Sequence, residues 1–194
     1  MHSDITRILT ELVNRTLSLG QIHFSARAEQ SPRTAPCLVI TLNNSCEAIF
    51  SSSGHMTHHP ANFLRINFGK QQMAIELQRE NVPAQQVQVA RRGPRTGAFL
   101  LQTLAELQMQ PDEQDTARLV VLSLLSHCRD LFGSDIRTAN RSRALFEAIR
   151  SYIDEHHASL LTRESVAQEF YISPNYLSHL FQKVGSVGFN EYLT

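Results

Sequence analysis

The side chains with the most regular chemical spacing lie between Ser173 and Val184. If this segment is a helix that turns by about 100° per residue, its apolar and polar side chains separate onto opposite sides. The apolar side holds Leu177, Leu180, Phe181 and Val184, and the polar side holds Asn175, Ser178, His179 and Gln182, with Lys183 on the flank. Short polar side chains of this kind bind the edges of bases in a major groove, and a flanking ammonium group reaches phosphates.

Helix signals surround this segment. Thr162 is a potential N-cap, and Glu164 follows in the first turn, where the helix dipole favours a carboxylate. Ser173-Pro174 has the pattern of an N-cap followed by a proline at the first helical position. The positions spaced for burial in the first helix are Val166, Ala167 and Phe170. Two short helices joined by a tight turn predict a helix-turn-helix over 162–184, although a helical pair with a solvated polar face gives the same generic pattern.

The segment 149–193 resembles the first helix-turn-helix of the AraC/XylS family of bacterial transcription regulators. The resemblance covers about a quarter of the chain. The residues that carry it are Tyr152-Ile153, Leu161-Thr162, Ala167, Phe170, Ile172-Ser173, Tyr176-Leu177-Ser178-x-Leu180-Phe181-x-Lys183, Gly185 and Phe189-x-x-Tyr192-Leu193.

The resemblance implies a role for each exposed position of the second helix. Asn175, Ser178 and His179 would meet bases, while Ser173, Gln182 and Lys183 would lie nearer the DNA backbone. It also implies double-stranded DNA and a small-molecule effector as partners, with RNA polymerase as a further candidate, and it requires no cofactor.

Two departures from the family pattern concern the end of the chain. The family has a second helix-turn-helix after a linker helix, whereas this sequence stops at Thr194, within the expected start of that helix at 187–194. Residues 141–194 hold five Lys and Arg against six Asp and Glu, a net charge of −1, although phosphate contacts supply much of the affinity of DNA-binding domains. We therefore expect weak DNA binding by this chain as a monomer. The alternative is a truncated interaction protein that dimerises with related regulators and titrates them.

The residues before this segment predict a different kind of structure. A helix is expected from Ser3 to Gly20, followed by a strand-rich region over 21–90 with runs at 37–42, 47–50, 63–68, 73–78 and 86–89. Strict alternation in the run 63–68 indicates half-buried strands, as in a sandwich or small barrel. Many AraC/XylS regulators place a cupin-like barrel here. We expect an α+β fold, in which this β-rich region and a helical pair precede an all-α, incomplete helix-turn-helix domain.

Helices are expected again over 97–132. The run 115–132 keeps one apolar stripe, and Leu119 and Leu122 add apolar side chains outside it. Such a helix is buried within its own domain or covers a partner subunit, and a homodimer through 113–132 is the simplest partner. The polar stretch 133–142 then predicts a joint between domains, although a loop within one domain gives the same pattern. It would separate an effector-sensing and dimerisation domain at 1–134 from a partial DNA-binding domain at 142–194.

Composition excludes several other classes of protein. The 18 Lys and Arg balance 18 Asp and Glu, so the whole chain carries no general polyanion-binding signal. The three cysteines lack a CxxC pair, which argues against a disulfide framework and favours the cytoplasm. No signal peptide, membrane span or common catalytic motif is recognisable, so we expect no enzyme.

Two clusters outside the helix-turn-helix have weaker interpretations. His55, His58 and His59 have a spacing that a metal ion accepts, but they follow a flexible turn and a solvated loop is favoured, so no metal is expected. The window 65–95 has a net charge of +4, which suits an anionic effector or DNA, although a solvated face is the commoner cause.

Overall fold

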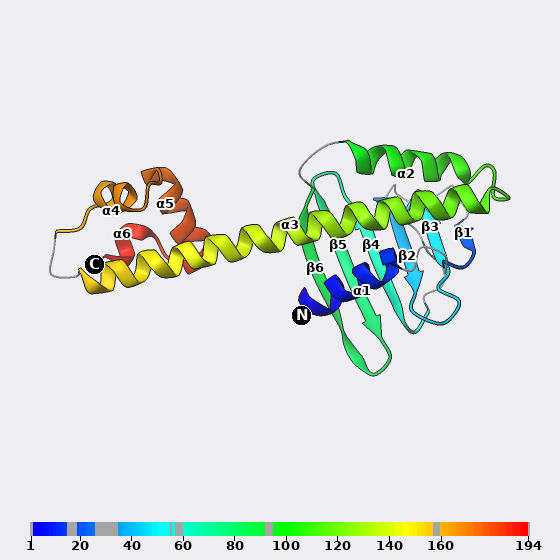
Figure 1. Ribbon diagram of the computed structural model, residues 1–194, viewed down its shortest axis with the longest axis horizontal. Coiled ribbons are helices and arrows are strands. Elements are labelled where there is room, and N and C mark those ends of the chain that lie inside the picture. The colour runs from blue at the N-terminus through cyan, green and yellow to red at the C-terminus, as the bar shows by residue number, and fades with distance from the viewer. Residues whose placement is uncertain are drawn as a thin grey trace. The chain divides into compact units, whose positions relative to one another are not determined.

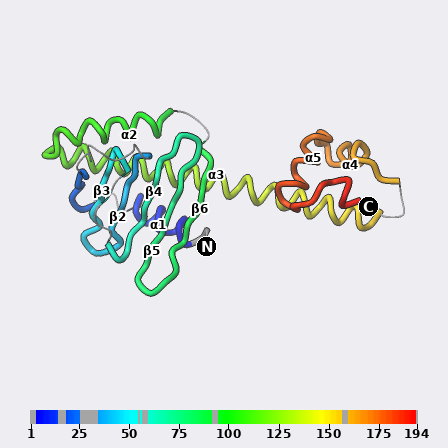
Figure 2. The backbone as a smooth tube through the Cα atoms, turned by 180° about the vertical axis from the view of Figure 1, so that it is seen from behind, coloured from blue at the N-terminus to red at the C-terminus, as the bar shows by residue number. Residues whose placement is uncertain are grey.

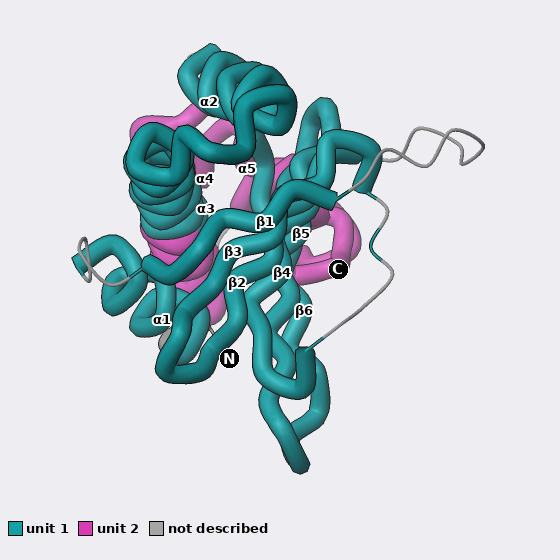
Figure 3. Tube along the Cα trace, turned by 90° about the vertical axis from the view of Figure 1, so that its right-hand side faces the viewer, with its two compact units in different colours: residues 1–135 teal, residues 136–194 magenta. Residues whose placement is uncertain are grey.

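The computed structural model describes residues 2–14, 19–25, 35–54, 56, 60–91, 95–156 and 160–193. The chain divides into two compact units, residues 1–135 and 136–194, which Figure 3 distinguishes by colour. The first unit contains α1 (His2–Asn14), β1 (Ile22–Phe24), β2 (Cys37–Thr41), β3 (Ala48–Ser51), β4 (Phe63–Phe68), β5 (Gln72–Arg79), β6 (Val82–Ala90) and α2 (Thr96–Leu107). The helix α3 (Gln114–Glu155) begins in this unit, and α4 (Arg163–Glu169), α5 (Pro174–Leu180), the π-helical turn η1 (Phe181–Gly185) and α6 (Phe189–Tyr192) follow. The α+β class is confirmed.

The described strands form one six-stranded sheet in the order β1-β3-β2-β4-β5-β6. All neighbouring strands are antiparallel except β1, which runs parallel to β3. Ile66 pairs with Leu38 on one side and with Ile75 on the other, so these apolar side chains share one face of the sheet. All three are fully buried. Helices α1, α2 and the first part of α3 lie on one side of this sheet (Figures 1 and 2).

The five predicted strand runs are all confirmed. Buried and half-buried residues alternate along most of β4 and β5, whereas every residue of β2 is buried. The expected closure into a barrel or a second packed sheet is not seen among the described strands, where β1 and β6 are the two edges of a single layer. Closure depends on pairing between the first and last strands, which local alternation does not encode. The three-residue strand β1 has too short a pattern to be predicted.

Side chains of the α2–α3 region hold the edge strand β1. Gln114 accepts a hydrogen bond from the Ile22 amide at 2.8 Å and donates to the Ile22 carbonyl at 3.1 Å. Gln108 donates to the carbonyl of Ser25 at 2.8 Å, and Arg118 donates to the carbonyl of Gly20 at 3.1 Å. The amide and carbonyl of Ile22 and the carbonyls of Gly20 and Ser25 are thereby satisfied.

The helix α3 differs from the sequence-based expectation. Residues 133–142 were predicted to be a joint between domains, and the division between the two compact units falls within them, after Asp135. They continue the helix without a break instead of forming a loop. The stretch contains no proline, which would break a helix, so its polar residues form solvent-exposed helix. Of the two off-stripe leucines, Leu122 is buried and Leu119 is 64% exposed. Leu122 therefore supports burial of this helix within its own chain, whereas Leu119 leaves an apolar side chain on the surface.

The three cysteines Cys37, Cys46 and Cys128 are free thiols and all are buried. Burial raises the pKa of the Cys128 thiol to about 12. Among the described residues, no helix is long and apolar enough to cross a membrane.

Gly20 tests the packing of the segment before β1 on the turn between β2 and β3. A methyl group in place of its hydrogen would overlap the carbonyl oxygen of Ser45, while the Gly20 amide donates to the carbonyl of Cys46 at 3.0 Å. We expect Gly20→Ala to lower the free energy of unfolding by about 1–3 kcal/mol, because rigid backbone must shift. Urea unfolding followed by circular dichroism measures this change.

Gly133→Ala is the matched control, since it makes the same chemical change inside α3. It should raise stability by about 1 kcal/mol through helix propensity. An unchanged midpoint for Gly20→Ala would contradict the described packing.

Candidate nucleic-acid interface

The first helix of the predicted pair begins as its sequence indicates. Thr162 is the N-cap of α4: its hydroxyl accepts from the Ser165 amide at 3.1 Å, and the Ser165 hydroxyl accepts from the Thr162 amide at 3.0 Å. This reciprocal capping box satisfies two amides that the helix leaves without partners. Glu164 lies in the first turn, and its hydrogen bond with Arg163 lowers the pKa of its carboxyl group. The start of α4 is thus fixed locally.

The turn between α4 and α5 is closed by two backbone hydrogen bonds. The Tyr171 amide donates to the Gln168 carbonyl at 3.1 Å, and the Ile172 amide donates to the Ala167 carbonyl at 3.0 Å. These two bonds define a Schellman motif, whose central residue adopts a left-handed backbone. That residue is Tyr171, with φ 53° and a side chain that is 96% exposed. The turn therefore uses a bulky residue where glycine has no steric cost.

The second helix begins at its predicted cap. The Ser173 hydroxyl accepts from the Tyr176 amide at 3.1 Å, and Pro174 occupies the first helical turn. Leu177 and Leu180 of α5 and Phe181 of η1 are buried, as predicted from a helix that turns by about 100° per residue. Val184 is half-buried. The apolar side of the segment thus faces the core of the second unit.

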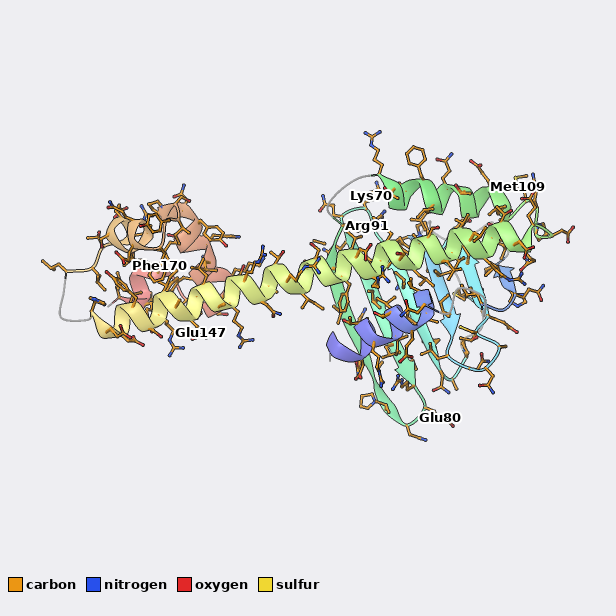
Figure 4. The ribbon with its side chains drawn as sticks, viewed as in Figure 1. Lys70, Glu80, Arg91, Met109, Glu147 and Phe170 are labelled. Carbon is orange, nitrogen blue, oxygen red and sulfur yellow. The ribbon has the colours of Figure 1, made fainter. Side chains whose placement is uncertain are left out.

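An aromatic cluster holds α5 against the rest of this unit. The ring of Phe181 lies 4.9 Å from that of Phe146 and 5.0 Å from that of Phe189, both in edge-to-face geometry. Phe170, labelled in Figure 4, packs edge-to-face on Tyr152 at 5.5 Å. Ile149, Ile153, Val166 and Ala167 complete the buried cluster. The small side chain of Ala167 permits the close crossing that a helix-turn-helix requires.

The end of the recognition segment departs from the predicted regular helix. Residues 181–185 form the π-helical turn η1, and Ser186 follows with φ 57°. A methyl group at Gly185 would lie 2.7 Å from the Phe146 ring, so this turn is packed closely on the core. Gln182 and Lys183 lie on η1. The directions of their side chains therefore differ from those expected for an α-helix, which turns by about 100° per residue.

The structure brings the six predicted DNA-contact residues onto α5, its N-cap and η1. Asn175, His179, Gln182 and Lys183 are exposed, and Ser178 is half-exposed. Within the described part of the chain, the side chains of these five residues form no hydrogen bonds or ion pairs, whereas the Ser173 hydroxyl serves the N-cap. The polar face of the segment is consequently available to a ligand.

Sequence reasoning missed Tyr176 as a candidate contact. Its side chain is 42% exposed on α5, next to Asn175 in the sequence. An aromatic residue beside a polar position of the predicted helix was the available signal.

Two basic residues of the second unit, Arg150 and Arg163, are already paired. Arg150 donates to the Tyr192 hydroxyl at 3.1 Å and lies 3.7 Å from Glu147 (labelled in Figure 4), and the Tyr192 hydroxyl contributes most to raising the pKa of Arg150. Arg163 pairs with Glu164 at 3.0 Å. These exposed pairs neutralise part of the positive charge that the second unit carries.

The two weaker clusters gain no support as ligand sites. His55, His58 and His59 lie outside the described residues, and the described residues contain no group of three or more metal-ligating side chains. In the basic window, Arg91 donates to the Gly69 carbonyl at 2.6 Å and Arg65 donates to Asn67 at 3.2 Å. Both arginines therefore hold local structure.

Comparison with known proteins identifies relatives along the whole chain. The uncharacterized HTH-type transcriptional regulator YijO of Escherichia coli strain K12 is 51% identical to this chain over an alignment of 220 positions. The alignment covers all of this chain and 77% of YijO. This chain belongs to the HTH-type transcriptional regulators. The uncharacterized HTH-type transcriptional regulator YpdC of the same organism is 38% identical over 112 residues, covering 57% of this regulator and 39% of YpdC. No family model and no solved structure matches this regulator.

The left-handed Tyr171 in this regulator provides a test of the turn. Tyr171→Gly removes the steric cost of a Cβ atom at φ 53° and loses little packing, because the side chain is exposed. We expect the free energy of unfolding to rise by about 1 kcal/mol. Tyr171→Ala is the matched control: it removes the ring but keeps the Cβ atom, so it should not stabilise. Equal stabilisation by both variants in urea unfolding would contradict the described turn.

Proposed function

We propose that this regulator is of the AraC/XylS type and binds double-stranded DNA sequence-specifically through the segment 173–184. The observation that carries the proposal is the two-sided character of this segment: its apolar side is buried in an aromatic core, and its polar side is exposed and without partners among the described residues. A helix placed in this way presents short polar side chains to base edges.

Each of the six residues has a proposed role in that complex. Asn175, Ser178 and His179 lie on α5 and contact bases in the major groove, while Ser173 at the N-cap and Gln182 and Lys183 on η1 contact the sugar-phosphate backbone. The backbone contacts fix the position of the helix and carry no sequence information, whereas the base contacts provide it.

The proposal assigns different tasks to the two parts of the chain. Residues 142–194 bind DNA, and residues 1–134 respond to a small-molecule effector and form a homodimer through 113–132. Leu119 supports the dimer, because a leucine that is 64% exposed on α3 gains from burial against a second copy. Effector binding then changes how the recognition segments are presented to DNA.

Two variants separate base contacts from phosphate contacts. The variants are compared by selection from a random duplex library, with binding quantified at several salt concentrations. His179→Ala should lose its preference at a particular base position, where discrimination against the wrong base falls by about 1–3 kcal/mol. Lys183→Ala should weaken binding to all sequences and reduce the salt slope by about one.

His156→Ala is the control for the base-contact variant, because it removes an exposed imidazole from the end of α3 and should leave the selected sequence unchanged. An unaltered sequence preference in His179→Ala would contradict the proposed recognition segment. A chain that dimerises but selects no sequence would instead fit the interaction protein considered from the sequence.

A negative charge at Leu119 tests the proposed dimer interface. Leu119→Glu should convert a dimer into a monomer in sedimentation velocity, since burying an unpaired carboxylate is unfavourable. Ala98→Glu adds the same charge at an exposed position of α2 and should leave the dimer intact. A Leu119→Glu chain that still sediments as a dimer would exclude this surface.

A further inference from the structure

A pocket of about 440 Å³ lies in the first unit, between α1 and one end of the sheet. Its wall combines the α1 residues Ile8, Glu11 and Leu12 with residues at the ends of β2 and β5 and next to β4. Pockets of this volume hold small organic molecules. The helix α1 lies across the sheet in Figure 1, and Glu80 in Figure 4 marks the turn next to the pocket residue Arg79.

Two opposite charges face this pocket from different elements. Glu11 comes from α1 and Arg79 from the end of β5, and the two side chains do not form an ion pair with each other. Glu11 has one distant partner, Arg7, at 4.0 Å, and Arg79 has no ion-pair partner among the described residues. Two charges that line one pocket without meeting leave room for a molecule that carries both complementary charges.

Two amide side chains, Asn43 and Asn62, also line the pocket and add hydrogen-bond donors to it. The Oδ1 atom of Asn43 accepts from the Thr41 hydroxyl, the Ser45 hydroxyl and the Cys46 amide at 2.9, 2.9 and 3.0 Å. The Oδ1 atom of Asn62 accepts from the Glu80 amide at 2.7 Å. Because both oxygens are occupied, the NH2 groups are the parts of these side chains that remain for a ligand.

A β-bulge between Leu77 and Arg79 explains why an arginine lines this pocket. The register of β5 with β6 shifts at this point, so that Arg79 pairs with Val82 while Leu77 pairs with Gln85. Bulges at strand ends change the direction of side chains. On the α1 side of the pocket, Ile8 and Leu12 are buried beside Glu11 and supply apolar lining.

We propose that this pocket is the effector site and that it binds a free α-amino acid with an apolar side chain. Arg79 and the amides of Asn43 and Asn62 receive the carboxylate, Glu11 receives the ammonium group, and the side chain lies against Ile8 and Leu12. The assignment rests on the proposed effector response, and it concerns a site within residues 1–135 that binds without DNA.

Calorimetry on the unmodified chain, without DNA, tests the ligand class directly. The common amino acids are screened one at a time at millimolar concentration, and the strongest binder is compared with its amide, which lacks the carboxylate, and with its deaminated acid, which lacks the amine. Saturable binding of the amino acid that falls about tenfold or more for each analogue supports the proposal. Absence of saturable binding by every amino acid, or equal binding of the deaminated acid, overturns it.

Paired variants then assign the two charges. Arg79→Gln should weaken binding of the amino acid about tenfold and leave its amide unaffected, while Glu11→Gln should weaken the amino acid and leave the deaminated acid unaffected. Glu113→Gln and Arg137→Gln make the same changes at exposed positions away from the pocket and should have no effect. Unchanged affinity in both pocket variants, with folding verified by circular dichroism, overturns the assignment.

The two proposals fail in different ways. Loss of amino-acid binding in the absence of DNA rejects the pocket and leaves sequence selection by 173–184 intact. Loss of sequence selection rejects the DNA-binding proposal and leaves the calorimetric result standing.

Discussion

Burial of the apolar residues of α3 is the interaction on which each unit depends. Ala117, Val121, Leu124, Leu125, Cys128 and Phe132 are buried in the first unit, and Phe146, Ile149 and Ile153 are buried in the second. A fully buried leucine, isoleucine or phenylalanine contributes about 1.5–3 kcal/mol, which exceeds any single cap or ion pair described. The residues of α3 between these groups, 133–145, are exposed or half-buried. Packing on either side thus sustains a helix whose middle has no core of its own.

The candidate DNA-binding segment is rigid for reasons that do not involve its polar face. Capping by Thr162 and Ser173 fixes where the helices begin, the Schellman motif at Tyr171 fixes the turn, and Phe181 fixes the rotation of the segment about its axis. Because structural roles fall on the caps and the apolar side, the side chains of Asn175, Ser178 and His179 form no hydrogen bond or ion pair among the described residues. A scaffold with this separation of roles supports different specificities on one backbone.

Local patterns predicted much of this structure from sequence. Short runs of branched apolar residues between turn residues located five strands, and the caps Thr162 and Ser173 located two helix starts, because these signals depend on neighbouring residues. The single-layer sheet and η1 were not predictable in the same way, since one depends on strand order and the other on packing among Phe146, Phe181 and Gly185. The pocket was not predictable from local patterns either. It is lined by residues far apart in the sequence, which come together around it only after the sheet and α1 have formed: Glu11, Asn43, Asn62 and Arg79.

The hydrogen bonds from Gln114 to Ile22 have a consequence for solubility. An open sheet exposes two edges, and an unpaired edge recruits strands from other molecules. The amide of Gln114 takes the place of a seventh strand at Ile22, and Gln108 and Arg118 occupy the carbonyls on either side of it. At the other edge, Pro83 lacks an amide donor, so β6 has one hydrogen-bond donor fewer to offer another strand. The β1 edge is already occupied at Ile22, which disfavours strand addition by another copy there.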